Sequence, residues 1–314
     1  HHIVSDGWSS GVLMRELSLV YDALAQKKSF SLPPLPIQYT DYAAWQRAWL
    51  EGPAREEQLG HWKTALSGAP SVLDLPTDRP RPAVRTLRGS TADFSLSEAE
   101  TTRLRALCAE AGVTPYMALL AAFGTYLARI SGQEDLVIGS PFAGRRLAET
   151  EPLIGFFVNT LPLRVDLRGD PSFLEVLSRV RKQTLGAHEH QDVPFEKIVE
   201  AVKPERILGT NPIFQVMFSL QQSQQGQMQL HGLNLELVDI ATDKAQFDLT
   251  LSVSDAGARI LGGLEFDLDL FDAWRAEAMA VQLGRLVAAL CKDPVAKVMG
   301  VDFLGAEERE ALLP

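Results

Sequence analysis

Two adjacent histidines open the chain, four residues ahead of an acid–glycine pair. The segment from His1 to Gly7 reads HHIVSDG. A histidine exchanges its proton near neutral pH and is therefore a natural general base. Asp6 is placed to orient a ring or to bind a cation, and Gly7 permits a turn that a side chain would obstruct. Taken alone, the two histidines can also be the end of a purification tag.

Four further segments contain polar residues between apolar neighbours in the sequence. They are Tyr39–Trp45, Ile154–Arg164, His190–Glu196 and Arg206–Phe214. Asn159 lies in an apolar stretch, where a buried amide needs a hydrogen-bond partner. Asp192 comes shortly before Pro194 and is predicted to cap a short helix. Asn211 precedes Pro212, a pair that favours a turn.

Taken together, the five segments resemble the motif series of condensation domains from nonribosomal peptide synthetases. The opening segment is similar to HHxxxDG, and Tyr39–Trp45 is similar to YxDFAVW. Ile154–Thr160 resembles IGxFVNT, with Arg164 at the trailing arginine. His190–Glu196 matches HQDVPFE throughout, whereas Arg206–Ile213 agrees with RDxSRNPL only in its first residue and in Asn-Pro. Five motifs in family order argue strongly against a tag.

The resemblance implies a two-lobed α/β fold like that of chloramphenicol acetyltransferase, and amide-bond formation between two thioester-bound substrates. It implies that His2 is nearest the chemistry, as a base or as a positioning group. His1, Asp6 and Gly7 are then structural support, with Arg164 as the candidate ion-pair partner of Asp6. The candidate substrate-channel residues are Ser5, Trp8, Asn159, Gln191, Asp192 and Asn211. The alternative for the aromatic residues Trp8, Tyr39, Tyr42 and Trp45 is a place in the core.

The resemblance also implies partners. No cofactor is expected to bind to this domain, because the phosphopantetheine arms of upstream and downstream peptidyl carrier proteins deliver the substrates. Phe303–Glu310 resembles the linker into an adenylation domain, so residues 301–314 are expected to begin that linker. A non-catalytic recruitment domain of the same fold and a freestanding coenzyme A-dependent acyltransferase are the alternatives. The intact HHxxxDG segment argues against the first, and the linker-like end argues against the second.

The chain departs from the family at its front, because two motifs that precede HHxxxDG are not found. We expect residues 1–74 to be the remainder of the N-terminal lobe, most of which is missing. Residues 75–89 form an expected Pro/Arg-rich crossing, and residues 90–300 the C-terminal lobe. The chain alone is expected to be weak or inactive. Its apolar surface along Leu13–Leu24 is expected to be exposed and to support dimerisation.

Composition excludes several other functions. The chain has 314 residues and a net charge of −10, which argues against nucleic acid or an anionic membrane as its main partner. Cys108 and Cys291 fall in apolar helical patterns, so we expect buried free thiols and a cytoplasmic location. There is no CxxC or HExxH, so no metal site is expected. No stretch approaches the ~18–20 apolar residues of a membrane span.

Hydrophobic periodicity predicts the elements that must position these residues. Leu13, Leu17, Val20 and Leu24 form one apolar stripe on a helix capped by Ser9 or Ser10. Further helices are predicted at about 39–51, 55–66, 98–111, 115–131, 173–188, 194–202 and from 272 onward. Strands are predicted at about 90–96, 136–140, 156–167, 214–220, 233–237, 247–253 and 260–266. Gln221–Gln229 is predicted to be a mobile loop, and the prolines and arginines of the crossing, Arg79, Arg81, Arg85 and Arg88, to be solvated.

Overall fold

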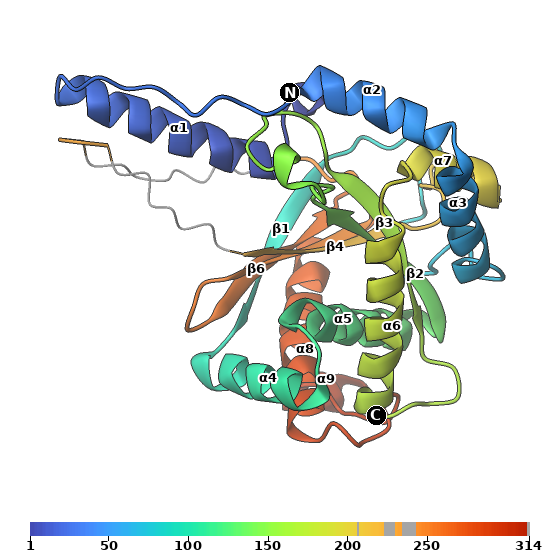
Figure 1. Cartoon of the computed structure of the whole chain (residues 1–314). Helices are drawn as coiled ribbons and strands as arrows, with labels where there is room; N and C mark the ends of the chain where they lie inside the picture. Colours follow the sequence, from blue (N-terminus) through green and yellow to red (C-terminus); the bar gives the residue numbers. More distant parts are fainter. Residues whose placement is uncertain (206, 223–229, 234–242, 313–314) are drawn as a thin grey trace.

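One six-stranded sheet organises the chain (Figure 1). The computed structural model describes residues 1–205, 207–222, 230–233 and 243–312. The strands are β1 (Gly89–Leu96), β2 (Asp135–Phe142), β3 (Asn159–Asp166), β4 (Val216–Gln222), β5 (Leu249–Asp255) and β6 (Ile260–Asp267). Their order is β1-β6-β5-β4-β2-β3, and β4 runs parallel to both of its neighbours while the other pairs are antiparallel.

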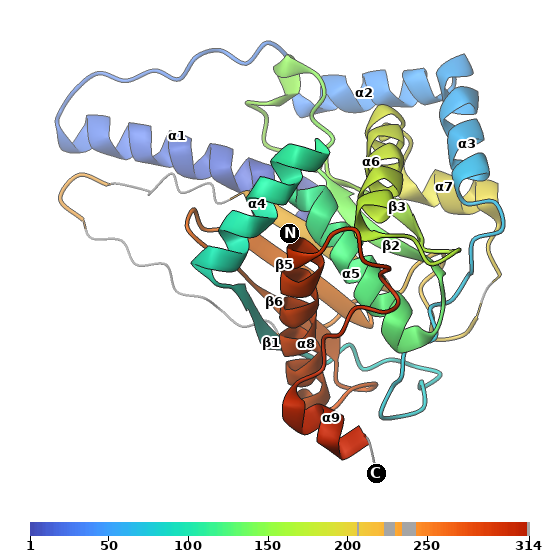
Figure 2. The same ribbon diagram turned by 90° about the horizontal axis from the view of Figure 1, so that it is seen from below.

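Helices complete a mixed α/β architecture, as the alternation of patterns predicts. They are η1 (His2–Val4), α1 (Gly7–Ala25), α2 (Tyr39–Leu50), α3 (Pro53–Ala65), α4 (Glu98–Ala111), α5 (Pro115–Ser131), η2 (Ala148–Thr150), α6 (Phe173–Glu189), α7 (Phe195–Val202), α8 (Ala273–Lys292) and α9 (Ala306–Leu312). Helices α4, α5, α6 and α8 pack together against the sheet (Figure 2). The core is densest around α5, where every residue from Met117 to Ala128 is buried.

Local signals explain where most helices begin and end. Ser97 and Ser172 accept hydrogen bonds from the backbone N–H of Glu100 and Glu175, completing the two predicted capping boxes. Gly112 ends α4 in the left-handed conformation, φ 64°. The prediction that Ser9 or Ser10 caps the first helix is wrong, because Asp6 is its N-cap. Asp272 precedes α8 as predicted, but its side chain makes no capping hydrogen bond.

Helix α1 projects away from the rest of the described chain (Figure 1). Only Ser9 and Val12 of this helix are buried. The apolar stripe is exposed instead, with Leu17 at 47% and Leu24 at 68% relative accessibility. The exposure that dimerisation would require is therefore present, whereas dimerisation itself stays a prediction.

The crossing lies between α3 and β1 and contains no helix or strand from residue 75 to residue 88. The prediction that its arginines are solvated holds for Arg79 and Arg88, with side chains 45% and 68% exposed, and is wrong for Arg81 and Arg85, at 22% and 9%. Each of the four meets an aspartate from the distant 248–272 region. The ion pairs are Arg79–Asp272, Arg81–Asp248, Arg85–Asp267 and Arg88–Asp269. Asp248 and Asp267 are buried, at 1% and 0% exposure. Charge pairing thus holds an irregular segment against the sheet.

Some predicted elements fall elsewhere or lie outside the described residues. The strand predicted from Phe156 begins only at Asn159, and residues 156–158 belong to the preceding loop. Positions 234–237 of one predicted strand and 223–229 of the predicted glutamine-rich loop lie outside the description. Across the described chain, no single helix could cross a membrane. Helices α4 and α5, which are bent by 105° relative to each other, are together long and apolar enough for a membrane span, but by length and composition only.

Candidate functional site

His2 lies on a single turn of 3-10 helix with its ring exposed. Its Nδ1 is 3.1 Å from the carbonyl oxygen of Ser5. Because a carbonyl oxygen only accepts, Nδ1 is the donor in this contact, and in the neutral ring the lone pair is then on Nε2. The edge of the ring meets Phe156, with centroids 5.6 Å apart. Among the described residues Nε2 has no hydrogen-bond partner, so His2 presents a basic nitrogen on a ring that packs against Phe156.

His1 makes a different contact. Its Nδ1 accepts a hydrogen bond from the N–H of Ile3 at 3.1 Å and so caps the turn that carries His2. Ser5 follows in extended conformation and contributes its carbonyl to His2. The two histidines are thus a structural residue and a chemically available one.

Asp6 is buried beneath this turn and organises the start of α1. Its Oδ1 accepts hydrogen bonds from the N–H and the hydroxyl of Ser9, both at 2.8 Å. Its Oδ2 accepts the N–H of Phe157 at 2.9 Å, a residue 151 positions away. Burial alone would raise the pKa of this carboxyl, but these donors and the Arg145 guanidinium outweigh it and hold the pKa below 3.8. Asp6 therefore remains ionised.

The ion-pair partner of Asp6 is Arg145, which the sequence analysis missed. Its Nη2 lies 3.3 Å from Asp6 Oδ1 and 2.8 Å from Ser9 Oγ, and its side chain is 1% exposed. Nη1 donates to the carbonyls of Thr150 and Leu153, and the guanidinium stacks 4.0 Å from the Phe157 ring centroid. We call Asp6, Ser9, Arg145 and Phe157 the Asp6 corner. The sequence feature that could have identified Arg145 is the Gly-Arg-Arg triplet that follows β2.

The predicted pairing of Asp6 with Arg164 is wrong. Arg164 lies on β3, and its Nη2 contacts Asp135 Oδ2 of β2 at 2.6 Å. Its Nη1 donates to the carbonyls of Ala65 and Ser67 after α3. Arg164 therefore joins the sheet to the end of α3. The opening motif and this arginine are not brought together.

The loop before β3 packs closely on α2. Tyr39 donates its hydroxyl to the carbonyl of Phe156 at 2.8 Å, and its ring meets Phe157 edge-on. A Cβ at Gly155 would lie 2.2 Å from the Tyr39 ring, so only glycine allows this approach. Burial raises the pKa of the neighbouring Tyr42 to about 12. Two motif segments thereby pack together next to Phe156, the aromatic residue that contacts His2.

Trp8, Trp45 and Gly7 are less enclosed than a core position requires. Trp8 donates Nε1–H to the carbonyl of Glu151 at 2.9 Å, yet it stays 37% exposed, and Trp45 is 44% exposed. Placing these tryptophans in the core is therefore wrong. Gly7 is the first residue of α1 rather than a turn residue, and no atom lies within 4 Å of the space a Cβ would take.

The segment from His190 to Glu196 is held by amides on both sides. Asn159 donates to the carbonyls of Gln191 and Val193, both at 2.8 Å, and accepts the N–H of Phe195. Its amide is fully engaged in structural contacts. Gln191 is buried and donates to the carbonyl of His188. These two candidate channel residues thus serve to shape the segment.

Asp192 does not cap α7, contrary to the prediction, since Pro194 is the N-cap residue. Its Oδ2 instead contacts Arg146 Nη1 at 2.6 Å. Gln58 of α3, which carried no sequence signal, accepts the N–H groups of Asp192 and Val193 and donates to Asp192 Oδ2. His190 stacks on His61, with centroids 3.9 Å apart.

Asn211 lies apart from this cluster. Its side-chain amide donates to the carbonyl of Gln246 at 3.1 Å, and its own carbonyl accepts from Gln215. The next residues turn sharply, with Ile213 at φ 72°. These contacts support the turn that Asn-Pro predicts.

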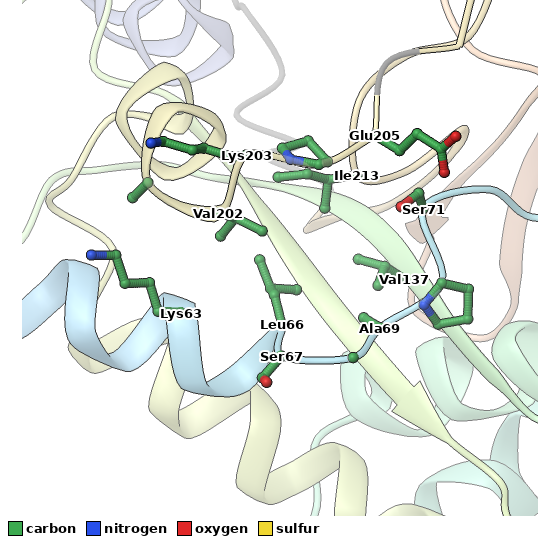
Figure 3. Close-up of a pocket in the computed structure, with 14 residues that line it drawn as sticks. Lys63, Leu66, Ser67, Ala69, Ser71, Val137, Val202, Lys203, Glu205 and Ile213 are labelled. Atoms are coloured by element: carbon green, nitrogen blue, oxygen red, sulfur yellow. The ribbon is translucent and has the colours of Figure 1, made fainter.

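A separate depression of about 430 Å³ lies where α3 and α7 end. Figure 3 shows Lys63 and Lys203 on one side and Glu205 and Ser71 on the other, with Leu66 and Val137 between them. None of its lining residues belongs to the cluster around His2. Within the described ranges, no group of three or more metal-ligating side chains is found.

Comparison with known proteins covers the whole chain. The family model for the condensation domain matches residues 1–313. Malpinin synthetase of Mortierella alpina is 46% identical over 313 residues, 100% of this chain and 4% of that protein. A linear gramicidin synthase of Brevibacillus parabrevis is 45% identical over 315 residues, again 100% of this chain and 4% of that protein. The chain thus spans a small part of these relatives.

Solved structures confirm the predicted α/β fold of the chloramphenicol acetyltransferase type. The X-domain from teicoplanin biosynthesis has a TM-score of 0.87 at 30% identity, covering 97% of this chain and 70% of that one. The same domain in complex with OxyB has a TM-score of 0.86 at 30% identity, over 97% and 69%. The four-domain synthetase holo-AB3403, bound to AMP and glycine, has a TM-score of 0.89 at 28% identity, over 98% and 24%.

Proposed function

The chain belongs to the condensation domain family of nonribosomal peptide synthetases, and from this we propose that it forms amide bonds within a longer synthetase. The donor is an acyl or peptidyl thioester on an upstream carrier protein. The acceptor is the amine of an aminoacyl thioester on a downstream carrier protein. Both substrates arrive on phosphopantetheine arms, so the domain itself needs no bound cofactor.

In the proposed reaction, the acceptor nitrogen attacks the donor thioester carbonyl. A C–N bond forms, the C–S bond breaks, and the amine proton passes through His2 to the departing thiolate. An ammonium cannot attack, so a base with its lone pair free is needed. The observation that carries this proposal is the exposed His2 ring, whose Nδ1 contacts the Ser5 carbonyl and whose Nε2 has no hydrogen-bond partner among the described residues.

The Asp6 corner supports this role from below. Asp6 joins the residues after His2 to α1 through Ser9 and to the distant loop through Phe157. Arg145 neutralises the buried carboxylate, which would otherwise be costly to bury. The corner therefore serves to keep the His2 turn against Phe156.

Further domains of the parent are also proposed on the resemblance. Residues 301–314 would begin a linker to an adenylation domain, with residues 1–74 and 90–300 as parts of two lobes. Residue Glu308 of α9 contacts Arg285 of α8 at 2.6 Å and accepts the N–H of Gly305. This contact would hold the start of the linker on the lobe.

The test is His2→Ala in the complete domain, assayed with loaded carrier proteins. Loss of a general base is expected to lower the rate about 10²–10⁴-fold. A smaller loss would indicate a positioning role. His188→Ala is the matched control, because His188 is an exposed histidine at the end of α6. Full product formation by His2→Ala would refute the catalytic role.

A protein-recruiting domain is the second candidate. One solved relative is described as a complex of the X-domain with OxyB. Under this alternative the complete domain would bind a partner protein and form no amide product. Product formation by the unchanged domain, lost in His2→Ala, separates the two functions.

A further inference from the structure

Two consecutive arginines in the loop between β2 and β3 contact acids of two different motif segments. Arg145 reaches Asp6 with a buried side chain. Arg146 reaches Asp192, with Nη1 2.6 Å from Oδ2 and 45% of its side chain exposed. A single loop thus connects the opening segment with the segment from His190 to Glu196.

The Asp192 end of this connection is firmly held. Gln58 Oε1 lies 3.1 Å from the N–H nitrogen of Asp192 and 3.2 Å from that of Val193. From the opposite side, Asn159 contacts the carbonyl of Val193 at 2.8 Å. Because α3 and β3 both hold this segment, Asp192 is a fixed point to which Arg146 binds.

The other end of the connection lies against His2. Gly144, at φ 66°, packs against the backbone of Phe157 later in the same loop. A Cβ at Gly144 would lie 2.1 Å from the Phe157 carbonyl oxygen. Phe157 donates its N–H to Asp6, and the adjacent Phe156 contacts the His2 ring. A displacement at Arg146 would therefore reach both the Asp6 corner and the contact of Phe156 with His2.

We propose that Arg146 is a positioning residue, which acts through its ion pair with Asp192 to set the loop that supports His2. The consequence for the rate rests on the proposed function, whereas the consequence for the His2 ring does not. An exposed ion pair contributes little to folding stability. Its loss is therefore expected to change the site more than it changes the fold.

The kinetic test is a double-mutant cycle in the complete synthetase module with loaded carrier proteins. Arg146→Gln and Asp192→Asn are each expected to lower kcat about fivefold with little change in KM, because the effect passes through the coupled pair. The double variant should be no slower than either single one. Arg146→Lys, which keeps the charge, should recover part of the rate. Additive losses would overturn the pairing.

The matched control is Arg105→Gln. Arg105 forms a comparable ion pair with Asp255, at 2.7 Å and with 38% and 31% of the two side chains exposed, between α4 and β5. It contacts neither motif segment. The rate of this variant should equal that of the unchanged module. An equal loss in the control would show a general effect of removing a surface charge, and would overturn the proposal.

A second readout needs no catalysis. In the present chain with labelled histidines, the His2 imidazole resonances are assigned by their loss in His2→Ala. Arg146→Gln and Asp192→Asn should shift these resonances, whereas Arg105→Gln should leave them in place. Unchanged His2 resonances would refute positioning through this pair. If they shift while the unchanged module makes no amide, the proposed function fails and the positioning role stands.

Discussion

Arginine–aspartate pairs build two regions of this chain, the Asp6 corner and the crossing, with different results. In the corner, a single buried pair joins a helix cap to an arginine 139 positions away. In the crossing, four pairs lie in series along a segment without regular structure, and their exposure ranges from buried to open. The corner holds the turn that carries His2, whereas the crossing directs the course of the chain.

Burial decides what such a pair does. Where both side chains are excluded from water, each charge depends on its partner and the geometry is strongly constrained. Where both are open to water, the pair contributes little and tolerates movement. Substitutions at buried and exposed pairs should therefore differ in their effect on stability and on the His2 turn.

The largest effect is expected from Arg145→Ala. The change leaves Asp6 buried without its cation and removes the donor to two carbonyls. We expect the free energy of unfolding in urea to fall by about 4 kcal/mol, with a shift of the His2 resonances. Asp6→Asn is the companion variant, because asparagine also caps helices. A loss below about 1 kcal/mol in both variants would mean that the corner behaves as a surface pair.

Arg85→Ala tests the most buried pair of the crossing. Arg85 contacts Asp267 Oδ2 through Nε at 2.9 Å and Nη2 at 2.7 Å, and Asp267 is 0% exposed. The free energy of unfolding should fall by about 3 kcal/mol. The His2 resonances should not move, because this pair is remote from the corner. Movement of those resonances would contradict the separation of the two regions.

The pH dependence distinguishes both regions from the stacked pair of His61, on α3, and His190, the C-cap residue of α6. Hydrogen bonds from Thr86 hold the pKa of Asp269 below 3.8, and the pKa of Asp6 is also lowered. The stability that these two carboxylates contribute is fully present above their unfolded-state pKa of 3.8 and is lost as the pH falls through their lowered folded-state pKa values. The contribution of each region to the free energy of unfolding should therefore be the same at pH 5 as at pH 7.

His61 acts with the same sign but in a higher pH range, because burial and then His190 lower its pKa from 6.5. Below pH 6.5 the unfolded state binds more protons, so stability should rise with pH up to that value. We expect this slope to flatten in His61→Gln, measured by urea unfolding at several pH values. A slope that survives in this variant would exclude His61 as its source.

The smallest effect is expected from Arg79→Ala. Arg79 and Asp272 form an ion pair with 45% and 40% of their side chains exposed. Its removal should cost less than about 1 kcal/mol and shift the melting temperature little. A loss as large as that of Arg85→Ala would show that the crossing acts as one cooperative unit rather than as separate pairs.

Helices and capping boxes were predictable because they depend on neighbouring residues. The Ser97–Glu100 and Ser172–Glu175 pairs lie one helical turn apart, so their contact follows from the chain itself. The burial of a helix was less predictable. Helices α1 and α5 both carry apolar patterns, yet α5 lies in the core and α1 projects outward, since burial depends on what packs against the helix.

For the candidate site, the order of amino acids was enough to single out the segments that the fold brings together: the opening segment and those around Phe156 and Asp192. The partners of these residues emerged only from the folded chain, which replaces Arg164 by Arg145 and reveals Gln58 and Arg146. The physical reason is range. Motif spacing reflects contacts within a turn or two, whereas an ion pair between residues 139 positions apart forms only where the fold brings the two charges together.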